Sequence, residues 1–264
     1  MPEGHTIHRL AKDLNDSLRP GKVKASSPQG PFAEQAAIID GNELVAAEAW
    51  GKLLFLDFEN SPLLQIHLGL IGKFRPKPLD TPPTDGAIRL RLEGKDQLWD
   101  LTGPMTCALI DDEDAAAITA KLGPDPLRKD GDVEDFIDRM SRKKVPLAAA
   151  LLDQKVLAGI GNVYRSEFCY LAGIDPHTPA NSLDQDTLRS LWDTATQQLK
   201  LGKKLNRIVT REPSEVGTTV GKIDDDNRLY VYKREGQPCH RCGDEIKLVE
   251  IAKRKAWYCP TEQV

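Results

Sequence analysis

Residues 157–167 read LAGIGNVYRSE, a glycine-rich turn that leads directly into a helix. Backbone N–H groups at a helix start, together with the positive end of the helix dipole, can bind a phosphate without a cationic side chain. Asn162 stands at this helix start, where its side chain could instead cap the helix. The stretch therefore predicts a phosphate-binding turn or a simple helix cap.

Helical patterns surround this turn. Apolar residues recur at helical spacing in the segments 133–142, 147–152, 163–171 and 183–201. A proline-rich break at residues 123–126 separates these segments from the part of the chain before them. We therefore predict a helical domain over residues 125–235.

The region before the break has the pattern of β-structure. Between residues 43 and 108 the apolar period is two, as in Leu54, Leu56 and Phe58, and Gly, Pro and Asn separate the runs. Strands without long helices between them favour an antiparallel sandwich or barrel. The first fourteen residues have helical spacing, so residues 1–124 are predicted to form a β domain with an N-terminal helix.

Residues 236–264 form a cysteine-bearing hairpin pattern. Cys239 and Cys242 make one knuckle, and Cys259 begins a second in which Glu262 stands at the place of a fourth cysteine. Two such pairs suit tetrahedral Zn²⁺, with Glu262 or His240 as candidates for the fourth ligand. The hairpin is predicted to hold one structural zinc, and metal-free packing of the same hairpin is the alternative.

The composition excludes several classes of protein. Of 264 residues, 40% are hydrophobic and 29% are charged, as in ordinary globular domains. No apolar run approaches the roughly 18 residues of a membrane span, and the N-terminus lacks the apolar core of a signal peptide. Five cysteines are too few for a disulfide scaffold in so long a chain. We expect a cytoplasmic monomer with no membrane partner.

The N-terminus offers a nucleophile. Removal of Met1 is common before a small residue, and would leave Pro2 as a free secondary amine. An α-amino group has a pKa of about 8, so a fraction is neutral and nucleophilic at neutral pH. Attack on an aldehyde-like sugar carbon gives a Schiff base, and Glu3 could move the protons. By themselves, Pro2 and Glu3 are also an ordinary start to a helix.

Several motifs in order resemble those of one enzyme family. They are the opening MPEG, the segments WGKLL at 50–54 and HLGL at 67–70, the turn and helix at 159–167, and the cysteine hairpin. Together they resemble the formamidopyrimidine-DNA glycosylase/endonuclease VIII family, with Gly4 closer to the endonuclease VIII side. The resemblance implies an α+β fold: an N-terminal β-sandwich with an N-terminal helix, a helix–two-turn–helix domain and a zinc-finger β-hairpin, 236–264.

The resemblance also implies roles for individual residues. Pro2 is the implied nucleophile, Glu3 the residue for proton transfer, and Lys52 the cation near the damaged nucleotide. Asn162 and Arg254 are implied to grip the phosphates beside the lesion. Leu70 matches the position of a wedge that fills the vacated base stack, and a core residue is its alternative interpretation.

The implied function is a bifunctional DNA glycosylase and abasic-site lyase of base-excision repair, acting through β,δ-elimination. Damaged double-stranded DNA is the expected partner, with single-stranded or bubble DNA as further candidates. A catalytically silent relative that binds abasic or distorted DNA is the alternative, and a metal-dependent nuclease using the acidic run 224–226 is another.

The chain departs from the family pattern at three further places. Thr6 stands where an acidic residue is common, and residues 100–104 lack an arginine that some relatives insert opposite the lesion. The stretch 211–227 is short for a loop that caps oxidised purines. We therefore expect oxidised pyrimidines to be favoured.

Overall fold

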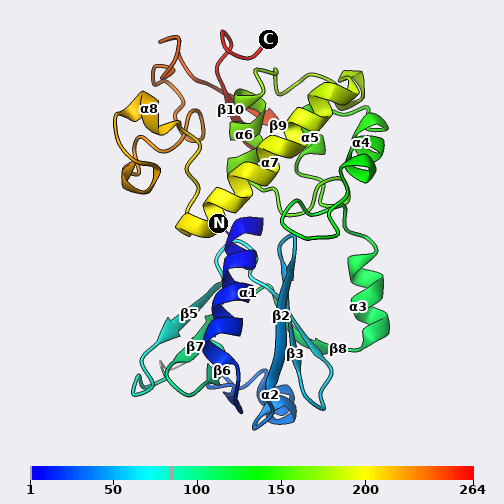
Figure 1. The fold of residues 1–264 in the computed structure, drawn as a ribbon, viewed down its shortest axis with the longest axis vertical. Coiled ribbons are helices and arrows are strands. Elements are labelled where there is room, and N and C mark those ends of the chain that lie inside the picture. The colour runs from blue at the N-terminus through cyan, green and yellow to red at the C-terminus, as the bar shows by residue number, and fades with distance from the viewer. Residues whose placement is uncertain (1, 84–85) are drawn as a thin grey trace. The chain divides into compact units, whose positions relative to one another are not determined.

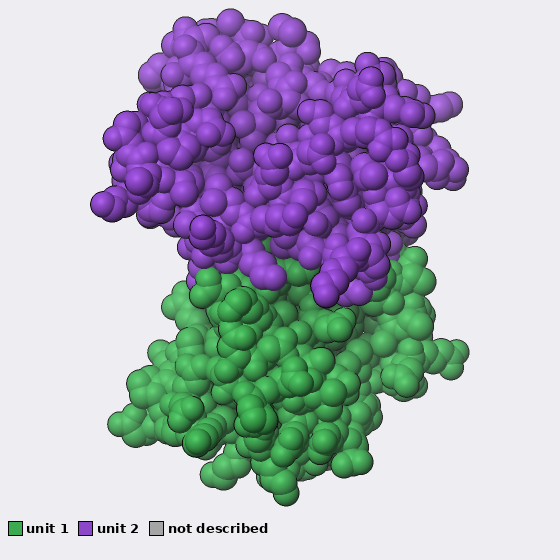
Figure 2. Space-filling model, in the orientation of Figure 1, with its two compact units in different colours: residues 1–121 green, residues 122–264 purple. Residues whose placement is uncertain are grey.

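The computed structural model describes residues 2–83 and 86–264. It divides into two compact units, residues 1–121 and residues 122–264, which Figure 2 shows in different colours. Each unit has its own hydrophobic core. Among the described helices, none is both long enough and apolar enough to cross a membrane.

The first unit is a sandwich of β-sheets with a long helix at its start (Figure 1). Its described strands form two four-stranded antiparallel sheets, in the orders β1-β6-β7-β5 and β2-β3-β4-β8. The strands are β1 (Lys24–Ser26), β2 (Leu44–Trp50), β3 (Leu53–Phe58), β4 (Leu63–His67), β5 (Lys73–Lys77), β6 (Ile88–Glu93), β7 (Leu98–Thr102) and β8 (Thr106–Ile110).

Helix α1 (Gly4–Leu18) is amphipathic and closes the core of the sandwich. It buries Ile7, Leu14 and Leu18 in the same cluster as residues of both sheets. Asn15 fixes the helix to β2, because its amide nitrogen donates to the Ala47 oxygen at 2.7 Å and its oxygen accepts from the Ala47 nitrogen at 2.9 Å. Two shorter helices, α2 (Ala33–Ile39) and α3 (Asp112–Thr119), complete the unit.

The alternation of buried and exposed residues is broken within β3 and β6. Phe55 on β3 and Arg91 on β6 lie between the apolar positions of their strands, yet they are only 7% and 5% exposed. Arg91 is buried because its guanidinium binds both oxygens of Asp100 on β7, at 2.8 and 2.9 Å. A buried charge is tolerated when it is paired in this way, so polarity alone does not mark the solvent face.

The second unit combines helices with the C-terminal hairpin (Figure 1). Its core joins Phe136, Leu147, Phe168 and Leu199 from four helices with Ile251 of the hairpin. The elements are α4 (Val133–Ser141), α5 (Leu147–Ala150), α6 (Asn162–Leu171), η1 (Ala180–Ser182), α7 (Gln185–Leu205), α8 (Pro213–Val216), η2 (Val220–Lys222), β9 (Lys247–Ile251) and β10 (Arg254–Tyr258).

Helix capping explains where the longer helices begin. The Asp132 carboxylate accepts a hydrogen bond from the Glu134 N–H at the start of α4, and Asp184 accepts one from Thr187 at the start of α7. Helix α7 ends at Leu205, and its C-cap residue, Asn206, has a left-handed conformation. It extends four residues beyond the predicted segment, and α5 is shorter than predicted.

Candidate functional site

The N-terminal pair lies directly before α1. Glu3 is the N-cap residue, in an extended conformation, and its backbone oxygen accepts hydrogen bonds from Thr6 at 2.9 Å and Ile7 at 3.4 Å. Glu3 is 0% exposed, which is rare for an acidic residue outside a functional or paired role, whereas Pro2 is half-buried. The predicted removal of Met1 concerns a residue outside those that the structure describes.

Lys52 lies in the two-residue turn between β2 and β3. Gly51 in this turn has a φ of 57°, a left-handed conformation that favours glycine. His67, at the end of β4, pairs with Leu53 and lies within the electrostatic reach of Lys52. Burial, and then the charge of Lys52, lower the pKa of His67, so this imidazole is mainly neutral at pH 7.

Three apolar side chains are exposed on two neighbouring turns. Leu70 and Ile71, between β4 and β5, are 61% and 78% exposed, and Met105, between β7 and β8, is 67% exposed. The turns touch, because a Cβ at Gly69 would lie 3.0 Å from the Met105 Cβ. We call these three residues the apolar patch. Exposed apolar groups that gather in this way mark binding surfaces.

The apolar patch decides between the two interpretations of Leu70 and adds two residues to the candidate site. The interpretation of Leu70 as a core residue is wrong, because its side chain projects from a turn instead of pointing into the sandwich. Sequence analysis did not single out Ile71 or Met105. The signal available was an apolar pair directly after a His-Leu-Gly turn, and a methionine in a turn between strands.

Asn162 and Arg254 come close together at the start of α6. The Asn162 amide nitrogen donates to the Lys255 backbone oxygen at 3.0 Å, one residue from Arg254 on β10. The alternative of an Asn162 helix cap is wrong, because Gly161 is the N-cap residue and Asn162 is the first helical residue. The Arg254 side chain is exposed, whereas Asn162 is 9% exposed.

Three cysteine sulfurs form a group that can hold a metal ion. The Sγ atoms of Cys239, Cys242 and Cys259 lie within 4.8 Å of one another. Sulfurs bound to one tetrahedral zinc lie roughly 3.8 Å apart, so the donors and their spacing fit that ion. Within the described part of the chain, this group includes neither a nitrogen of His240 nor a carboxylate oxygen of Glu262.

The surroundings of Cys239 favour its thiolate, whereas burial raises the pKa of the Cys259 thiol to about 12. Burial opposes ionisation of Cys239, but the Tyr170 hydroxyl and the backbone N–H groups of Cys242 and Arg241 lower its pKa overall. The Tyr170 oxygen is 3.2 Å from the Cys239 sulfur. The His240 ring is instead surrounded by charge from Arg234 and Arg211, and burial, followed by these cations, lowers its pKa to about 4.

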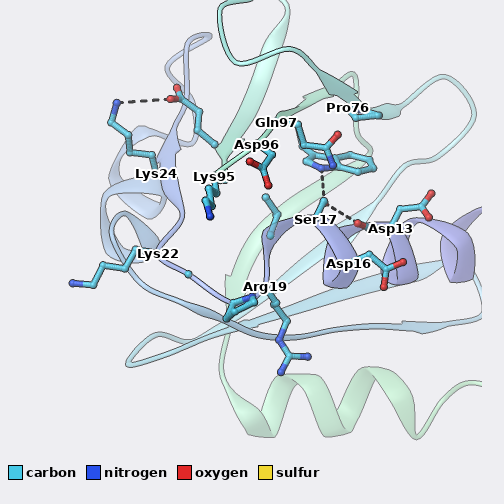
Figure 3. Close-up of a pocket in the computed structure, with 16 residues that line it drawn as sticks. Asp13, Asp16, Ser17, Arg19, Lys22, Lys24, Pro76, Lys95, Asp96 and Gln97 are labelled. Carbon is cyan, nitrogen blue, oxygen red and sulfur yellow. Dashed lines mark hydrogen bonds and ion pairs between the residues drawn. The ribbon is translucent and has the colours of Figure 1, made fainter.

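A separate hollow of about 1010 Å³ lies at the other end of α1 (Figure 3). Its walls include the basic residues Arg19 and Lys22, the acidic residues Asp16 and Asp96, and Trp99. A helix of 15 residues is roughly 22 Å long, so this hollow is far from the helix start that carries Pro2 and Glu3. It is not part of the candidate site.

Comparison with known proteins decides the family. Matches cover the formamidopyrimidine-DNA glycosylase N-terminal domain over residues 1–102, the formamidopyrimidine-DNA glycosylase H2TH domain over 122–214, and the zinc finger found in FPG and IleRS over 236–261. Endonuclease 8 1 of Mycobacterium tuberculosis is 38% identical over 267 residues, with 100% of both chains covered. The chain belongs to the formamidopyrimidine-DNA glycosylase family.

Two further relatives agree. The formamidopyrimidine-DNA glycosylase of Herpetosiphon aurantiacus is 31% identical over 283 residues, covering 100% of this chain and 98% of that protein. A solved complex of Lactococcus lactis Fpg with DNA containing an abasic site matches with a TM-score of 0.80 and 26% identity, over 99% of each chain. The predicted family and the predicted α+β fold are confirmed.

Membership of the formamidopyrimidine-DNA glycosylase family has two immediate consequences. The chain is a base-excision repair glycosylase of this family, and the hairpin is a zinc finger with a structural zinc site, as predicted. Cys239, Cys242 and Cys259 are the residues that would hold the zinc. When bound, the ion supplies folding free energy to a hairpin that is too small to form a core of its own.

Proposed function

We propose that this glycosylase is bifunctional, releasing an oxidised base and then cleaving the strand at the resulting abasic site. The observation that carries the proposal is the fully buried carboxyl of Glu3 beside Pro2, at the start of α1. A nucleophilic amine and an adjacent acid are the two groups that Schiff-base chemistry on a sugar requires.

The proposed reaction begins at the Pro2 amine. The amine attacks C1′ of the damaged nucleotide, the bond from C1′ to the base breaks, and the base leaves with that electron pair and takes up a proton. The sugar ring then opens: the C1′–O4′ bond breaks, O4′ keeps its electron pair and takes up the proton that the amine loses, and an iminium remains between Pro2 and C1′. Glu3 carries these protons, and Lys52 binds the negatively charged nucleotide.

Strand cleavage follows from the iminium. Removal of a proton from C2′ lets the 3′ phosphate leave by β-elimination, and removal of a proton from C4′ lets the 5′ phosphate leave by δ-elimination. Water then hydrolyses the iminium and frees Pro2. The iminium acts as the electron sink in each elimination, so no metal ion is required in either step.

The remaining site residues bind the DNA in this proposal. Leu70, with Ile71 and Met105, fills the space left when the damaged nucleotide turns out of the duplex. Asn162 and Arg254 hold backbone phosphates. Damaged double-stranded DNA is the proposed partner, supported by the similarity to the L. lactis complex with abasic DNA. We further propose that the protein acts as a monomer on cytoplasmic, nucleoid DNA.

We propose oxidised pyrimidines as the favoured bases. Two observations support this preference: the short stretch 211–227, and the name endonuclease 8 of the relative that is 38% identical. A panel of duplexes, each with one oxidised pyrimidine or one oxidised purine, tests it through the single-turnover rate of base release. Faster release of the purines would overturn the preference.

Borohydride trapping tests the mechanism. The protein, with its N-terminal residue verified by mass spectrometry, is mixed with a duplex that contains one abasic site and then reduced. We expect a covalent cross-link on Pro2. Pro2→Gly keeps an amine and should retain some cleavage, whereas an added N-terminal residue should abolish it. Equal activity of the two variants contradicts the proposed nucleophile.

The alternatives predict different results in the same assay. A catalytically silent relative binds the abasic duplex but gives no cross-link. A nuclease built on the acidic run loses cleavage in a short EDTA treatment. The structure gives this run other partners, because Asp224 accepts from the Asn227 N–H at 2.9 Å and Asp225 pairs with Arg228 at 3.1 Å. Among the described residues, only the three cysteines form a metal-binding group.

A further inference from the structure

Arg165 on α6 is a completely buried arginine whose side chain reaches the C-terminal hairpin. It is 0% exposed, and its Nη2 donates to the backbone oxygens of Arg254 at 3.1 Å and Lys255 at 2.8 Å. Its Nη1 lies 3.4 Å from the oxygen of Ile251 and 3.3 Å from that of Ala148. Three of these four carbonyls belong to the hairpin, so the guanidinium binds the backbone on both sides of the β9–β10 turn.

The β9–β10 turn, which Arg165 binds, has a backbone conformation that its two residues do not favour. Ile251 and Arg254 pair directly across the hairpin, and the two residues between them are Ala252 and Lys253. Their φ angles are 54° and 59°, in the left-handed region that two-residue hairpin turns require and that glycine or asparagine normally occupies. Neither residue favours this conformation, so the turn needs support from outside the hairpin.

The side chain of Arg254 is exposed while its backbone is held. Asn162, three residues before Arg165 on the same helix, donates to the Lys255 oxygen at 3.0 Å. Helix α6 therefore fixes the backbone of the residue on each side of the peptide bond that joins Arg254 to Lys255. The exposed Arg254 guanidinium then starts from a fixed point, which reduces the conformational freedom lost when it binds a phosphate.

We propose that Arg165 is a positioning residue for DNA binding: it holds the strained Ala252–Lys253 turn in the conformation that presents Arg254 to a backbone phosphate. The inference rests on the proposed phosphate contact of Arg254. Arginine suits this role because its planar guanidinium carries five donors in a fixed fork, which can bind several carbonyls at once. A lysine keeps the charge but gathers its donors on a single nitrogen.

The test is the salt dependence of DNA binding by the full-length, zinc-loaded protein. The dissociation constant for a duplex with one tetrahydrofuran abasic analogue is measured between about 50 and about 200 mM salt. Each lost phosphate contact lowers the slope of log Kd against log salt by about 0.9. Destabilisation of the fold alone reduces the active fraction but leaves this slope unchanged.

Four variants and one control define the expected result. Arg254→Ala should lower the slope by about 0.9, the value for one phosphate contact. Arg165→Lys should lower the slope by nearly as much and should weaken binding about tenfold at low salt. The variant with both changes should match Arg254→Ala alone. Ala252→Gly changes no charge and relieves the turn, so adding it to Arg165→Lys should restore the slope. Arg91→Lys, at a buried arginine of the sandwich, is the control and should leave the slope unchanged.

Three outcomes overturn the inference in distinguishable ways. An unchanged slope for Arg165→Lys beside a lowered slope for Arg254→Ala removes the role of Arg165 and leaves the phosphate contact intact. An unchanged slope for Arg254→Ala removes the contact itself and the inference with it. If Arg165→Lys does not fold, the variant with both Arg165→Lys and Ala252→Gly replaces it. A low slope in this variant, once it is shown to be folded, contradicts the inference. Failure of wild type to prefer abasic over intact duplex counts against the proposed function.

Discussion

The two compact units support their candidate functional residues in different ways. In residues 1–121, Pro2, Lys52 and Leu70 lie at a helix start and in turns of a unit that contains a large cluster of buried apolar side chains. The buried ion pair of Arg91 and Asp100 lies within one sheet, between β6 and β7. These positions depend on strand pairing and on short turns, which the local sequence largely dictates.

In residues 122–264, buried charged side chains hold the functional segments. Arg165 binds carbonyls of the hairpin, and Glu167, also 0% exposed, accepts hydrogen bonds from the backbone N–H groups of Tyr230, Val231 and Tyr232 at 2.8 to 2.9 Å. Both charges come from one turn of α6. A buried charge that is hydrogen-bonded to several backbone groups holds a segment strongly. If these partners move away, the charge stays buried without partners, which destabilises the fold.

We infer from this difference that the two units have different functions. The first unit carries the groups proposed for bond making and breaking, and the second carries the zinc and the proposed phosphate contacts. Changes in the first unit should therefore reduce the rate of the chemical steps, and changes in the second should reduce affinity.

Glu3→Gln should have the largest effect on rate. We expect the single-turnover rate of base release to fall by about 10²–10⁴, because the amide cannot transfer protons. The Kd for a tetrahydrofuran duplex should be nearly unchanged, which gel-shift titration checks. Glu34→Gln, on the first turn of α2, is the matched control and should keep the wild-type rate. If the affinity of Glu3→Gln for DNA fell by as large a factor as its rate, Glu3 would be a DNA-binding residue instead of a proton carrier.

Loss of the zinc ligands should act on the other unit. Cys259→Ala should lower zinc content, measured by elemental analysis, from about one ion per chain, and should weaken DNA binding by about 10–100-fold. The sandwich should keep its own thermal transition, because its core contains none of the ligands. Cys107→Ala, a cysteine of β8 outside the group, should retain the zinc. Full zinc content in Cys259→Ala would contradict the three-sulfur assignment.

Truncation of the apolar patch should have a smaller and substrate-dependent effect. Changing Leu70, Ile71 and Met105 together to Ala should lower kcat/KM on a duplex lesion by about tenfold, since a wedge offsets part of the free energy of unstacking. The same variant should act almost normally on a single-stranded abasic oligonucleotide, where no stack is opened. Leu79→Ala, an exposed apolar residue outside the patch, is the control. Equal losses on both substrates would remove the wedge role.

The smallest predicted effect concerns pH and His67. Its pKa is lowered in the folded state by burial and by Lys52, so the unfolded chain binds the proton more readily. This imidazole therefore contributes stability above the unfolded pKa of about 6.5, and the contribution is lost as pH falls from there to the lowered folded value. The fall in Tm between pH 7 and pH 5 should be smaller in His67→Gln than in wild type. An identical fall in both proteins would show that His67 is not involved.

Much of the molecule could be read from local sequence. Alternation marked β3 and β6, helical spacing marked α1 and α4, and the cysteine spacing marked the zinc hairpin. These signals are local, because each depends on the spacing of apolar residues or of metal ligands within a short stretch of chain. The ordered motifs predicted the family, and the comparisons with known proteins confirmed that prediction.

Tertiary structure decided the features that depend on distant partners. The Asn162 side chain binds the oxygen of Lys255, 93 residues away, instead of capping its own helix. Asp100 makes Arg91 an interior residue, and the touching of two turns places Met105 beside Leu70 in an exposed patch. No periodicity encodes such pairs, because the free energy of burying a charge or exposing an apolar side chain depends on what the rest of the chain brings to it.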